Sequence, residues 1–255
     1  MLELFILYAF FAGLGTWFIT ALGSSLVFFI NSENKKIISL VMGTGAGIML
    51  AASFFSLILP SIESIEINNK SYFEAILGFL FGGVFLYFFD FILNKMESKK
   101  DRMDKSDKLL FLAITLHNIP EGLAIGVAFG LALESGLQVD LINAFLLALG
   151  IGLQNFPEGL AISLPLKNNG MKKSKAFCYG QLSAIIEPIS AVIGVLLIYL
   201  IEMILPFILC FASGAMIYVV VEELIPKGKI NQDDKMCTIG IIIGFTIMMM
   251  LDLLF

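Results

Sequence analysis

Long apolar runs separated by short polar stretches recur along the whole chain. Eight of these runs are long enough to cross the hydrocarbon core of a membrane, which takes about 20 residues of helix. They cover residues 3–30, 37–60, 72–94, 109–132, 140–164, 176–200, 206–225 and 236–254. Their periodicity is helical or uniformly apolar, without the strict alternation of a membrane β-strand. The pattern therefore predicts an all-α integral membrane protein with eight transmembrane helices.

The composition leaves little room for any other class of protein. Of the 255 residues, 58% are hydrophobic and only 15% are charged, whereas about 25% of a typical soluble domain is charged. Almost no sequence remains outside the eight runs for a soluble domain. We therefore expect a single transmembrane domain over residues 1–255, with its function inside the helix bundle.

The basic residues are distributed unevenly between the loops. Every lysine and arginine except Lys70 lies in the loops after the first, third, fifth and seventh runs. By the positive-inside rule, these loops face the cytoplasm and both termini lie outside it. The longest of them, residues 95–108, mixes charges densely and is expected to be a solvated, mobile cytoplasmic loop.

A polar motif occurs twice inside the apolar runs. HNIPEGLAIG begins at His117, and QNFPEGLAIS begins 37 residues later at Gln154. The run that carries the first copy crosses outward and the next run crosses inward, so the two copies are antiparallel. This arrangement is typical of the inverted repeats of transporters, in which interrupted helices meet around a site near the membrane midplane.

The repeat places polar groups on shared helix faces. His117 and Glu121 are four residues apart, as are Gln154 and Glu158, so each pair shares a face. Pro120 and Pro157 each remove a backbone donor and leave a carbonyl free one turn earlier. In a membrane such carbonyls need water or another partner, so the motif indicates a hydrated or ligand-filled cavity. Asn118 and Asn155 lie one position beyond the first residue of each copy.

The charge balance of these segments favours a bound divalent cation. A carboxylate within the membrane costs several kcal/mol unless it is paired or ligated, and His117 is the one basic residue within the predicted spans. A third carboxylate, Glu187, precedes Pro188 in the otherwise uncharged sixth run. One imidazole with carboxylate and amide oxygens suits Zn²⁺, Fe²⁺, Mn²⁺ or Cd²⁺ better than Ca²⁺ or Mg²⁺.

Five further residues have weaker signals. A methionine within a helix, such as Met49, is most often core filler. Four acids lie near the ends of spans, where solvated helix ends explain them on the pattern alone: Asp90, Glu222, Glu223 and Asp252.

The paired motifs HNxPEG and xNxPEG, within a layout of eight spans, resemble the ZIP (Zrt/Irt-like) family of divalent metal transporters, in particular its prokaryotic GufA-like branch. The resemblance covers the whole chain. It implies a binuclear metal site at the midplane, with Glu121 and Glu158 as bridging ligands. By position, one metal would be held by these two carboxylates with His117, Gln154 and Met49. The second metal would use Asn118, Asn155 and Glu187 with the same bridges.

The resemblance also implies a route for the metal. The chain differs from the usual family pattern at two positions of the second motif copy. Asp90, Glu222, Glu223 and Asp252 match positions that such proteins use for entry or cytoplasmic release. Many relatives have a histidine where this chain has Gln154, or an aspartate where it has Asn155. The site is thus poorer in nitrogen ligands, which leaves room for iron or manganese beside zinc.

We therefore expect an uptake transporter of a prokaryotic inner membrane that moves divalent metal, Zn²⁺ first, into the cytoplasm by alternating access. The family resemblance suggests that spans 1, 4, 5 and 6 move against the others, with close helix sliding at Gly122, Gly126, Gly159 and Gly180. The expected partners are metal ions and the lipid bilayer, with a homodimer left open, no nucleic acid and no catalytic cofactor. The alternatives are a metal-selective channel, a Ca²⁺ or Mg²⁺ carrier, and an intramembrane metalloenzyme, which a single histidine argues against.

Overall fold

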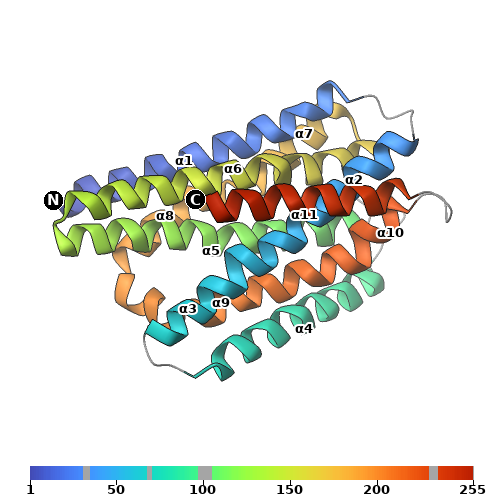
Figure 1. Ribbon diagram of the computed structural model, residues 1–255. Coiled ribbons are helices and arrows are strands. Elements are labelled where there is room, and N and C mark those ends of the chain that lie inside the picture. The colour runs from blue at the N-terminus through green and yellow to red at the C-terminus, as the bar shows by residue number, and fades with distance from the viewer. Residues whose placement is uncertain (31–34, 68–70, 97–104, 230–234, 255) are drawn as a thin grey trace.

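The computed structural model describes residues 1–255 except 31–34, 68–70, 97–104, 230–234 and 255. The described chain is an elongated bundle of helices (Figure 1). In chain order the elements are α1 (Leu2–Ser25), η1 (Leu26–Phe28), α2 (Lys35–Ala52), η2 (Ser53–Ile58), α3 (Leu59–Ile67), α4 (Phe73–Met96), α5 (Lys105–Ser135), α6 (Gln138–Asn168), α7 (Lys173–Leu182), α8 (Ile186–Leu196), α9 (Ile198–Val219), η3 (Val220–Leu224), α10 (Ile225–Gly228) and α11 (Met236–Leu254).

Within the described parts of the chain, eight helical stretches are long and apolar enough to cross a membrane, which confirms the eight predicted spans. Their ends differ from the sequence prediction by a few residues, and most at the second span, which runs to Ile67 rather than 60. The loop expected over residues 95–108 is shorter at both ends, because α4 runs to Met96 and α5 begins at Lys105. Residues 97–104 of that expected loop lie outside the described residues.

The helices form two groups, and each helix packs mainly on members of its own group. The first helix group contains α1, α5, α6, α7 and α8, in which α1 packs on α6 and α5 packs on α8. The second helix group contains the remaining helices from α2 to α4 and from α9 to α11, in which α2 packs on α11 and α4 on α9. The groups meet chiefly where α5 contacts α9 and where α6 contacts α2.

Glycine permits the closest approaches within each group. In the first helix group, a Cβ on Gly126 of α5 would lie 2.1 Å from the Ala191 carbonyl oxygen of α8. A Cβ on Gly159 of α6 would lie 2.1 Å from the Thr20 carbonyl oxygen of α1. Gly122 and Gly180 also pack against residues of the same group. These four glycines therefore hold the first helix group together, rather than lining its boundary with the second as the sliding hypothesis expected.

The interruptions in the helices do not lie at the motif prolines. Both α5 and α6 are continuous helices of 31 residues that contain Pro120 and Pro157. The second and seventh spans instead contain the π-helical segments η2 and η3. The sixth span is broken by a turn at residues 183–185, between α7 and α8. Such interruptions free backbone groups and redirect side chains, and π segments often occur at functional sites.

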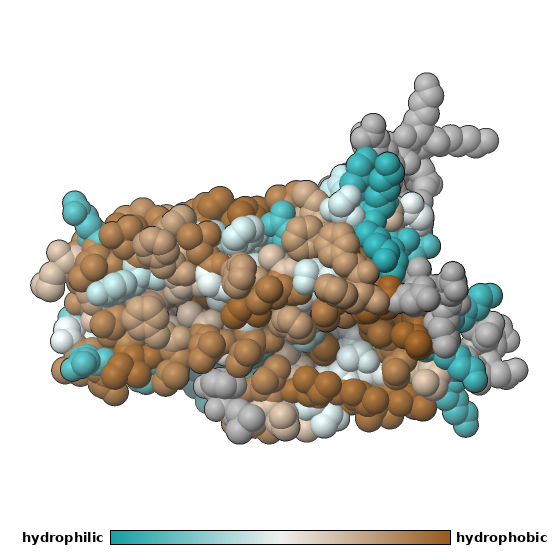
Figure 2. Space-filling view, turned by 90° about the horizontal axis from the view of Figure 1, so that it is seen from above, coloured by the Kyte–Doolittle hydropathy of each residue, from teal (hydrophilic) through white to brown (hydrophobic). Residues whose placement is uncertain are grey.

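The two ends of the bundle differ in charge. Figure 1 shows α1 starting, and α11 running, toward the end where α5 turns into α6; we call this the terminal end. At the opposite end, which we call the basic end, α2, α5 and α7 begin and α4 and α10 end, and each of them carries lysine there. Figure 2 shows an apolar middle, with hydrophilic residues gathered at the ends of the molecule. This surface fits a protein whose middle is surrounded by lipid.

Candidate metal centre

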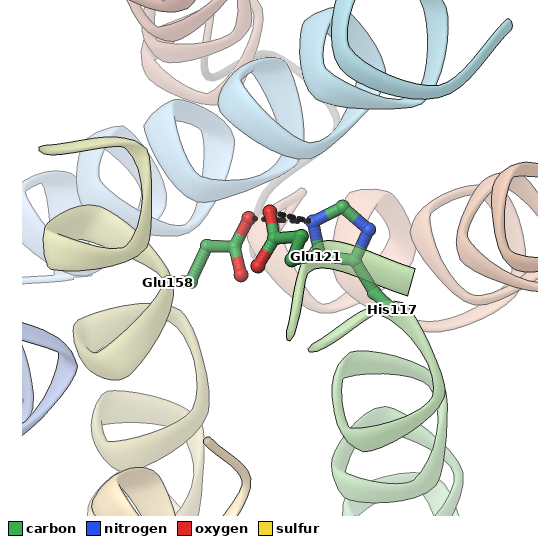
Figure 3. A group of neighbouring side chains, drawn as sticks. All are labelled: His117, Glu121 and Glu158. Carbon is green, nitrogen blue, oxygen red and sulfur yellow. Dashed lines mark ion pairs between the residues drawn. The ribbon is translucent and has the colours of Figure 1, made fainter. Parts of the chain in front are cut away.

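Three side chains from the two motif copies converge in the middle of the bundle. His117 Nε2 lies 2.9 Å from Glu121 Oε1 on the same helix and 3.2 Å from Glu158 Oε1 on α6. Figure 3 shows both carboxylates turned toward the imidazole. One ligand atom of each residue lies within 4.8 Å of the others, a separation that suits ligands of one metal ion. We call these three residues the central cluster.

The central cluster is almost fully buried and lacks hydrogen bonds for its charge. His117, Glu121 and Glu158 are 0%, 5% and 1% exposed. Both oxygens of each carboxylate, and both nitrogens of His117, have no hydrogen-bond partner among the described residues. The ion pairs to His117 can offset one negative charge of the two. Buried carboxylates without partners are unfavourable, so the cluster fits a bound cation.

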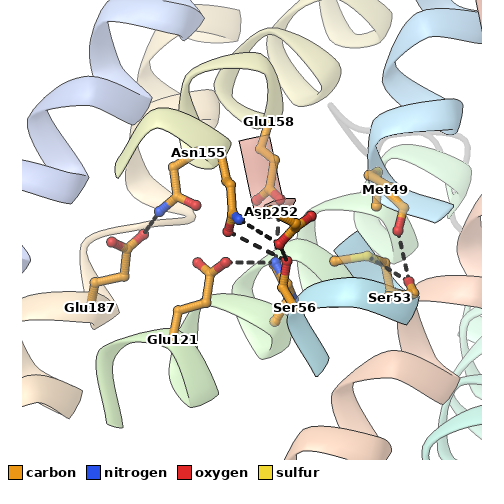
Figure 4. A network of polar contacts seen from close by, with 11 residues as sticks. Met49, Ser53, Ser56, Glu121, Asn155, Glu158, Glu187 and Asp252 are labelled. Atoms are coloured by element: carbon orange, nitrogen blue, oxygen red, sulfur yellow. Dashed lines mark hydrogen bonds and ion pairs between the residues drawn. The ribbon is translucent and has the colours of Figure 1, made fainter. Parts of the chain in front are cut away.

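The break in the sixth span brings a third carboxylate toward this centre. Glu187 lies in the first turn of α8, where the helix dipole favours a negative charge. The Asn155 side-chain amide donates to Glu187 Oε1 over 2.9 Å (Figure 4). Glu187 Oε2 and Asn155 Oδ1 are buried without a hydrogen-bond partner among the described residues. These two oxygens are therefore available as metal ligands beside the central cluster.

Gln154 belongs to a separate polar network. Its side-chain amide donates to Asp252 Oδ1 over 2.7 Å, and the Ser56 hydroxyl donates to the same oxygen over 2.8 Å. The same Ser56 hydroxyl lies 3.4 Å from Gln154 Oε1. Figure 4 shows Asp252 on the side of the centre where Glu158 and Ser56 lie. Asp252 is thus held inside the bundle, whereas the sequence pattern alone favoured a solvated helix end.

A cavity of about 650 Å³ connects this network to the terminal end of the bundle. Glu121, Gln154, Ser56 and Asp252 line its inner part, and the exposed Glu63 also lines it. Its remaining lining is mostly apolar and comes from both helix groups. The central cluster can therefore be reached from the terminal end through a cavity that contains three acidic side chains.

On the other side of the central cluster, the two groups are packed together. One apolar cluster there contains Leu109 and Ile114 of α5, Leu166 of α6, Met42 of α2 and Leu224 of η3. Near Leu164 and Leu224 the space left between α6 and the second group is only about 10 Å³. The described residues thus leave the interior open toward the terminal end and closed toward the basic end.

The surroundings of the remaining predicted residues differ from one to the next. Asn118 is 1% exposed, and neither amide atom has a hydrogen-bond partner among the described residues. Met49 is fully buried on α2, and its carbonyl accepts a hydrogen bond from Ser53. Asp90 accepts a hydrogen bond from the Tyr218 hydroxyl over 3.4 Å, between α4 and α9.

Glu222 and Glu223 both lie in the π segment η3. Glu222 is exposed, whereas Glu223 is 9% exposed, so only the first fits the solvated position that the pattern favoured. Neither glutamate belongs to the three-residue group that could hold a metal ion.

Comparison with known proteins agrees with this geometry. The family model described as "ZIP Zinc transporter" matches residues 106–252, which include both motif copies and Glu187. The chain belongs to the ZIP family. Among its relatives, "Zinc transporter ZIP11" of Xenopus tropicalis is 37% identical, over 93% of this chain and 94% of the relative.

Bacterial ZIP proteins are similar over comparable lengths. "Zinc transporter GufA" of Myxococcus xanthus is 34% identical, over 92% of this chain and 93% of the relative, so the resemblance to the GufA branch is confirmed. "Zinc transporter ZIPB" of Bordetella bronchiseptica is 31% identical, over 96% of this chain and 80% of the relative. Because the family consists of transporters, the chain is not an enzyme.

Two residues of this ZIP protein that face the cavity, Ser56 and Glu63, could not be assigned a role from the sequence pattern alone. Ser56 and Glu63 follow Met49 at intervals of seven residues, which puts all three near one face of the second span. Ser56 connects Gln154 with Asp252, and Glu63 lines the cavity. The seven-residue spacing shows that these residues share a helix face. It indicates no function for them until Gln154 and Asp252 are known to lie opposite that face.

Proposed function

We propose that this ZIP protein carries divalent transition metal into the cytoplasm, with Zn²⁺ as the first candidate and Fe²⁺, Mn²⁺ and Cd²⁺ as the others. The observation that carries the proposal is the central cluster, in which an imidazole and two carboxylates, all buried, converge within 4.8 Å. The relatives are named zinc transporters. One nitrogen and several oxygen ligands suit a transition metal that must also be released.

The proposed site holds two metal ions. The first ion takes His117, Glu121 and Glu158, with Gln154 and Met49 as further ligands. The second takes Asn118, Asn155 and Glu187 and shares the two glutamates of the central cluster. The free Glu187 Oε2 and Asn155 Oδ1 atoms support this second position. Two dications side by side need more negative charge than either set of ligands offers alone, so shared carboxylates are expected.

The asymmetry of the bundle supports transport by alternating access. The cavity reaches Glu121 from the terminal end, while apolar packing closes the basic end. Movement of the first helix group against the second would close the cavity and open the other side. A metal-selective channel would use the same ligands, but it needs a continuous path, and the packed basic end favours a carrier.

We place the basic end in the cytoplasm and both termini outside it, in a multi-pass inner-membrane protein with one transmembrane domain over residues 1–255. The distribution of lysine and arginine supports this orientation. Metal entering the cavity would then come from outside, pass Glu63 and Asp252 on the way to the central cluster, and leave past Asp90, Glu222 and Glu223. A homodimer is compatible with this arrangement.

The test is metal uptake by purified protein in liposomes that contain a zinc-sensitive dye. The double substitution Glu121→Ala with Glu158→Ala should reduce Zn²⁺ uptake to the rate of protein-free liposomes. Glu66→Ala is the matched control, because Glu66 is an exposed acid at the terminal end of α3. Undiminished Zn²⁺ uptake by the double variant would refute the proposed site. Competition with Cd²⁺, Fe²⁺ and Mn²⁺, with internal pH recorded, would identify the preferred metal and any proton coupling.

A further inference from the structure

A second buried charge lies at the basic end, on the same helix as His117 but nearly three turns before it. Asp107, in the first turn of α5, has a side chain that is 2% exposed. Lys227 of α10 places its Nζ 2.9 Å from Asp107 Oδ1. The Asn169 side-chain amide lies 2.9 Å from both oxygens of the same carboxylate. The Asp107 carboxylate is therefore held by one cation and one amide.

The three residues come from both sides of the boundary between the helix groups. Asp107 belongs to α5, and Asn169 directly follows α6, so both belong to the first helix group. Lys227 lies on α10, in the second helix group, and α10 packs against α2. The hydrogen bond from Ser39 of α2 to the Gly228 carbonyl also ties α10 to that group. The ion pair Asp107–Lys227 therefore joins one group to the other.

This ion pair lies in the closed half of the structure. Leu109 and Leu110, which follow Asp107, are 0% and 1% exposed and belong to the apolar cluster that joins the two groups. Leu224, three residues before Lys227, belongs to the same cluster. Any movement that opens the basic end must separate these surfaces, and must therefore separate Lys227 from Asp107.

The geometry points to Asp107 and Lys227 as a latch that keeps the basic end closed while the cavity at the terminal end is open. This inference rests on the proposed function, because a latch matters only if the two groups move against each other. Asn169 is the positioning residue: it holds the carboxylate from within the first helix group, so the charge stays in place when Lys227 leaves. In the open state the Lys227 ammonium and the Asp107 carboxylate would both be hydrated.

Removing the cation should favour the open basic end for a physical reason. In the closed state a variant without Lys227's charge leaves the Asp107 carboxylate buried with Asn169 alone, which is unfavourable. In the open state the same carboxylate is in water, so removal of the Lys227 charge costs it little free energy. The substitution therefore destabilises the closed state more than the open one, and the population shifts toward the open one.

The experiment measures access to a cysteine buried in the closed half. Leu164 of α6 is 1% exposed and lines the small space beside Leu224, so Leu164→Cys reports opening of the basic end. The background carries Cys178→Ser, because Cys178 is the exposed cysteine. The full-length protein in lipid nanodiscs, where both faces are accessible, is treated with a charged thiol reagent. With Lys227→Met, labelling should be about tenfold faster than in the parent.

Three further variants separate a latch from a general loss of packing. Lys227→Arg keeps the charge and should label as slowly as the parent. Lys229→Met removes an exposed lysine two residues away and should also leave labelling slow. Asp107→Asn is the second test variant and should speed labelling as Lys227→Met does. Equal labelling rates in the parent, Lys227→Met and Asp107→Asn, with all three folded by size-exclusion chromatography, would overturn the latch.

Calorimetric titration with Zn²⁺ tests the proposed metal site independently of the latch. It uses proteins that keep Leu164 in place of the reporter cysteine. Lys227→Met should bind Zn²⁺ within about twofold of the parent, because the ion pair does not touch the central cluster. A parent that binds no Zn²⁺ would refute the metal site, whereas the labelling rates would still decide whether the ion pair holds the basic end closed. If Lys229→Met were labelled as fast as Lys227→Met, the latch would also be overturned.

Discussion

His117 of α5 reaches Glu158 of α6, with 3.2 Å between Nε2 and Oε1. This contact joins the two copies of the repeated motif, and it explains why the copies differ. One copy supplies the imidazole and both supply a glutamate, while Gln154, at the position that matches His117, turns its amide toward Asp252. The repeat therefore builds an asymmetric centre, with the imidazole and two carboxylates on one side and a polar connection to the cavity on the other.

Loss of charge at Glu158 should weaken metal binding without disturbing the fold. Glu158→Gln keeps the shape of the side chain but removes a carboxylate that, among the described residues, has no hydrogen-bond partner. We expect Zn²⁺ to bind about 100-fold more weakly, measured by calorimetric titration of the purified protein. Glu63→Gln, at an exposed position of the cavity, should change the affinity little. Equal affinities of Glu158→Gln and the parent would place the metal elsewhere.

The metal preference should depend on the single imidazole. His117→Asp replaces the one histidine of the chain with an oxygen ligand. Zn²⁺ and Cd²⁺ should lose relative uptake, while Mn²⁺ should gain, because oxygen-only sites favour harder cations. Competition between these ions in liposome uptake measures the change. An unchanged order of preference would favour a Ca²⁺ or Mg²⁺ type of carrier over a transition-metal site.

Asp252 should act on the rate at which metal arrives. Its carboxylate lines the cavity and lies beside Gln154, so it attracts cations toward the central cluster. Asp252→Asn should lower uptake at subsaturating Zn²⁺ by about threefold to tenfold, with a smaller effect at high salt. Initial rates at several ionic strengths test this. A deficit that does not change with salt would contradict an electrostatic role.

The close packing of the first helix group gives a stability prediction. A Cβ on Gly126 would lie 2.1 Å from the Ala191 carbonyl oxygen, so Gly126→Ala must push α8 away from α5. We expect a Tm lower by about 5 °C in detergent, because overpacking costs roughly 1–3 kcal/mol. A Cβ on Gly15 meets no atom within 4 Å, so Gly15→Ala is the matched control and should not lower the Tm. Equal Tm values for both variants would contradict the packing described for α5 and α8.

The spans and the convergence of the motif side chains could be predicted from sequence because both depend on local pattern. The apolar runs predicted all eight spans, and the paired motifs placed His117, Glu121 and Glu158 on facing helices. The helix interruptions could not be predicted in the same way. Pro120 and Pro157 lie within continuous helices, whereas the turn at residues 183–185 contains no proline. Tertiary packing decides which helices stay continuous, so the position of a proline does not by itself predict a break in the helix.

Contacts between distant residues account for the other differences. Asp252 lies near the end of the last span, where the pattern favours a solvated acid, but Ser56 and Gln154 hold it inside the cavity. Asp107 and Lys227 are 120 residues apart, and in the sequence each resembles an ordinary charge at a helix end. Such pairs become visible only when the helices that carry them are placed side by side.

The central claim, that His117, Glu121 and Glu158 bind the transported metal, is tested most directly by zinc X-ray absorption on untagged protein loaded with one equivalent of Zn²⁺. The chain contains one histidine, so any imidazole signal from the protein must come from His117. We predict one nitrogen ligand from imidazole with oxygen ligands at about 2.0–2.2 Å, and loss of the imidazole signal in His117→Ala. A spectrum without imidazole scattering, or one unchanged in His117→Ala, would contradict the account.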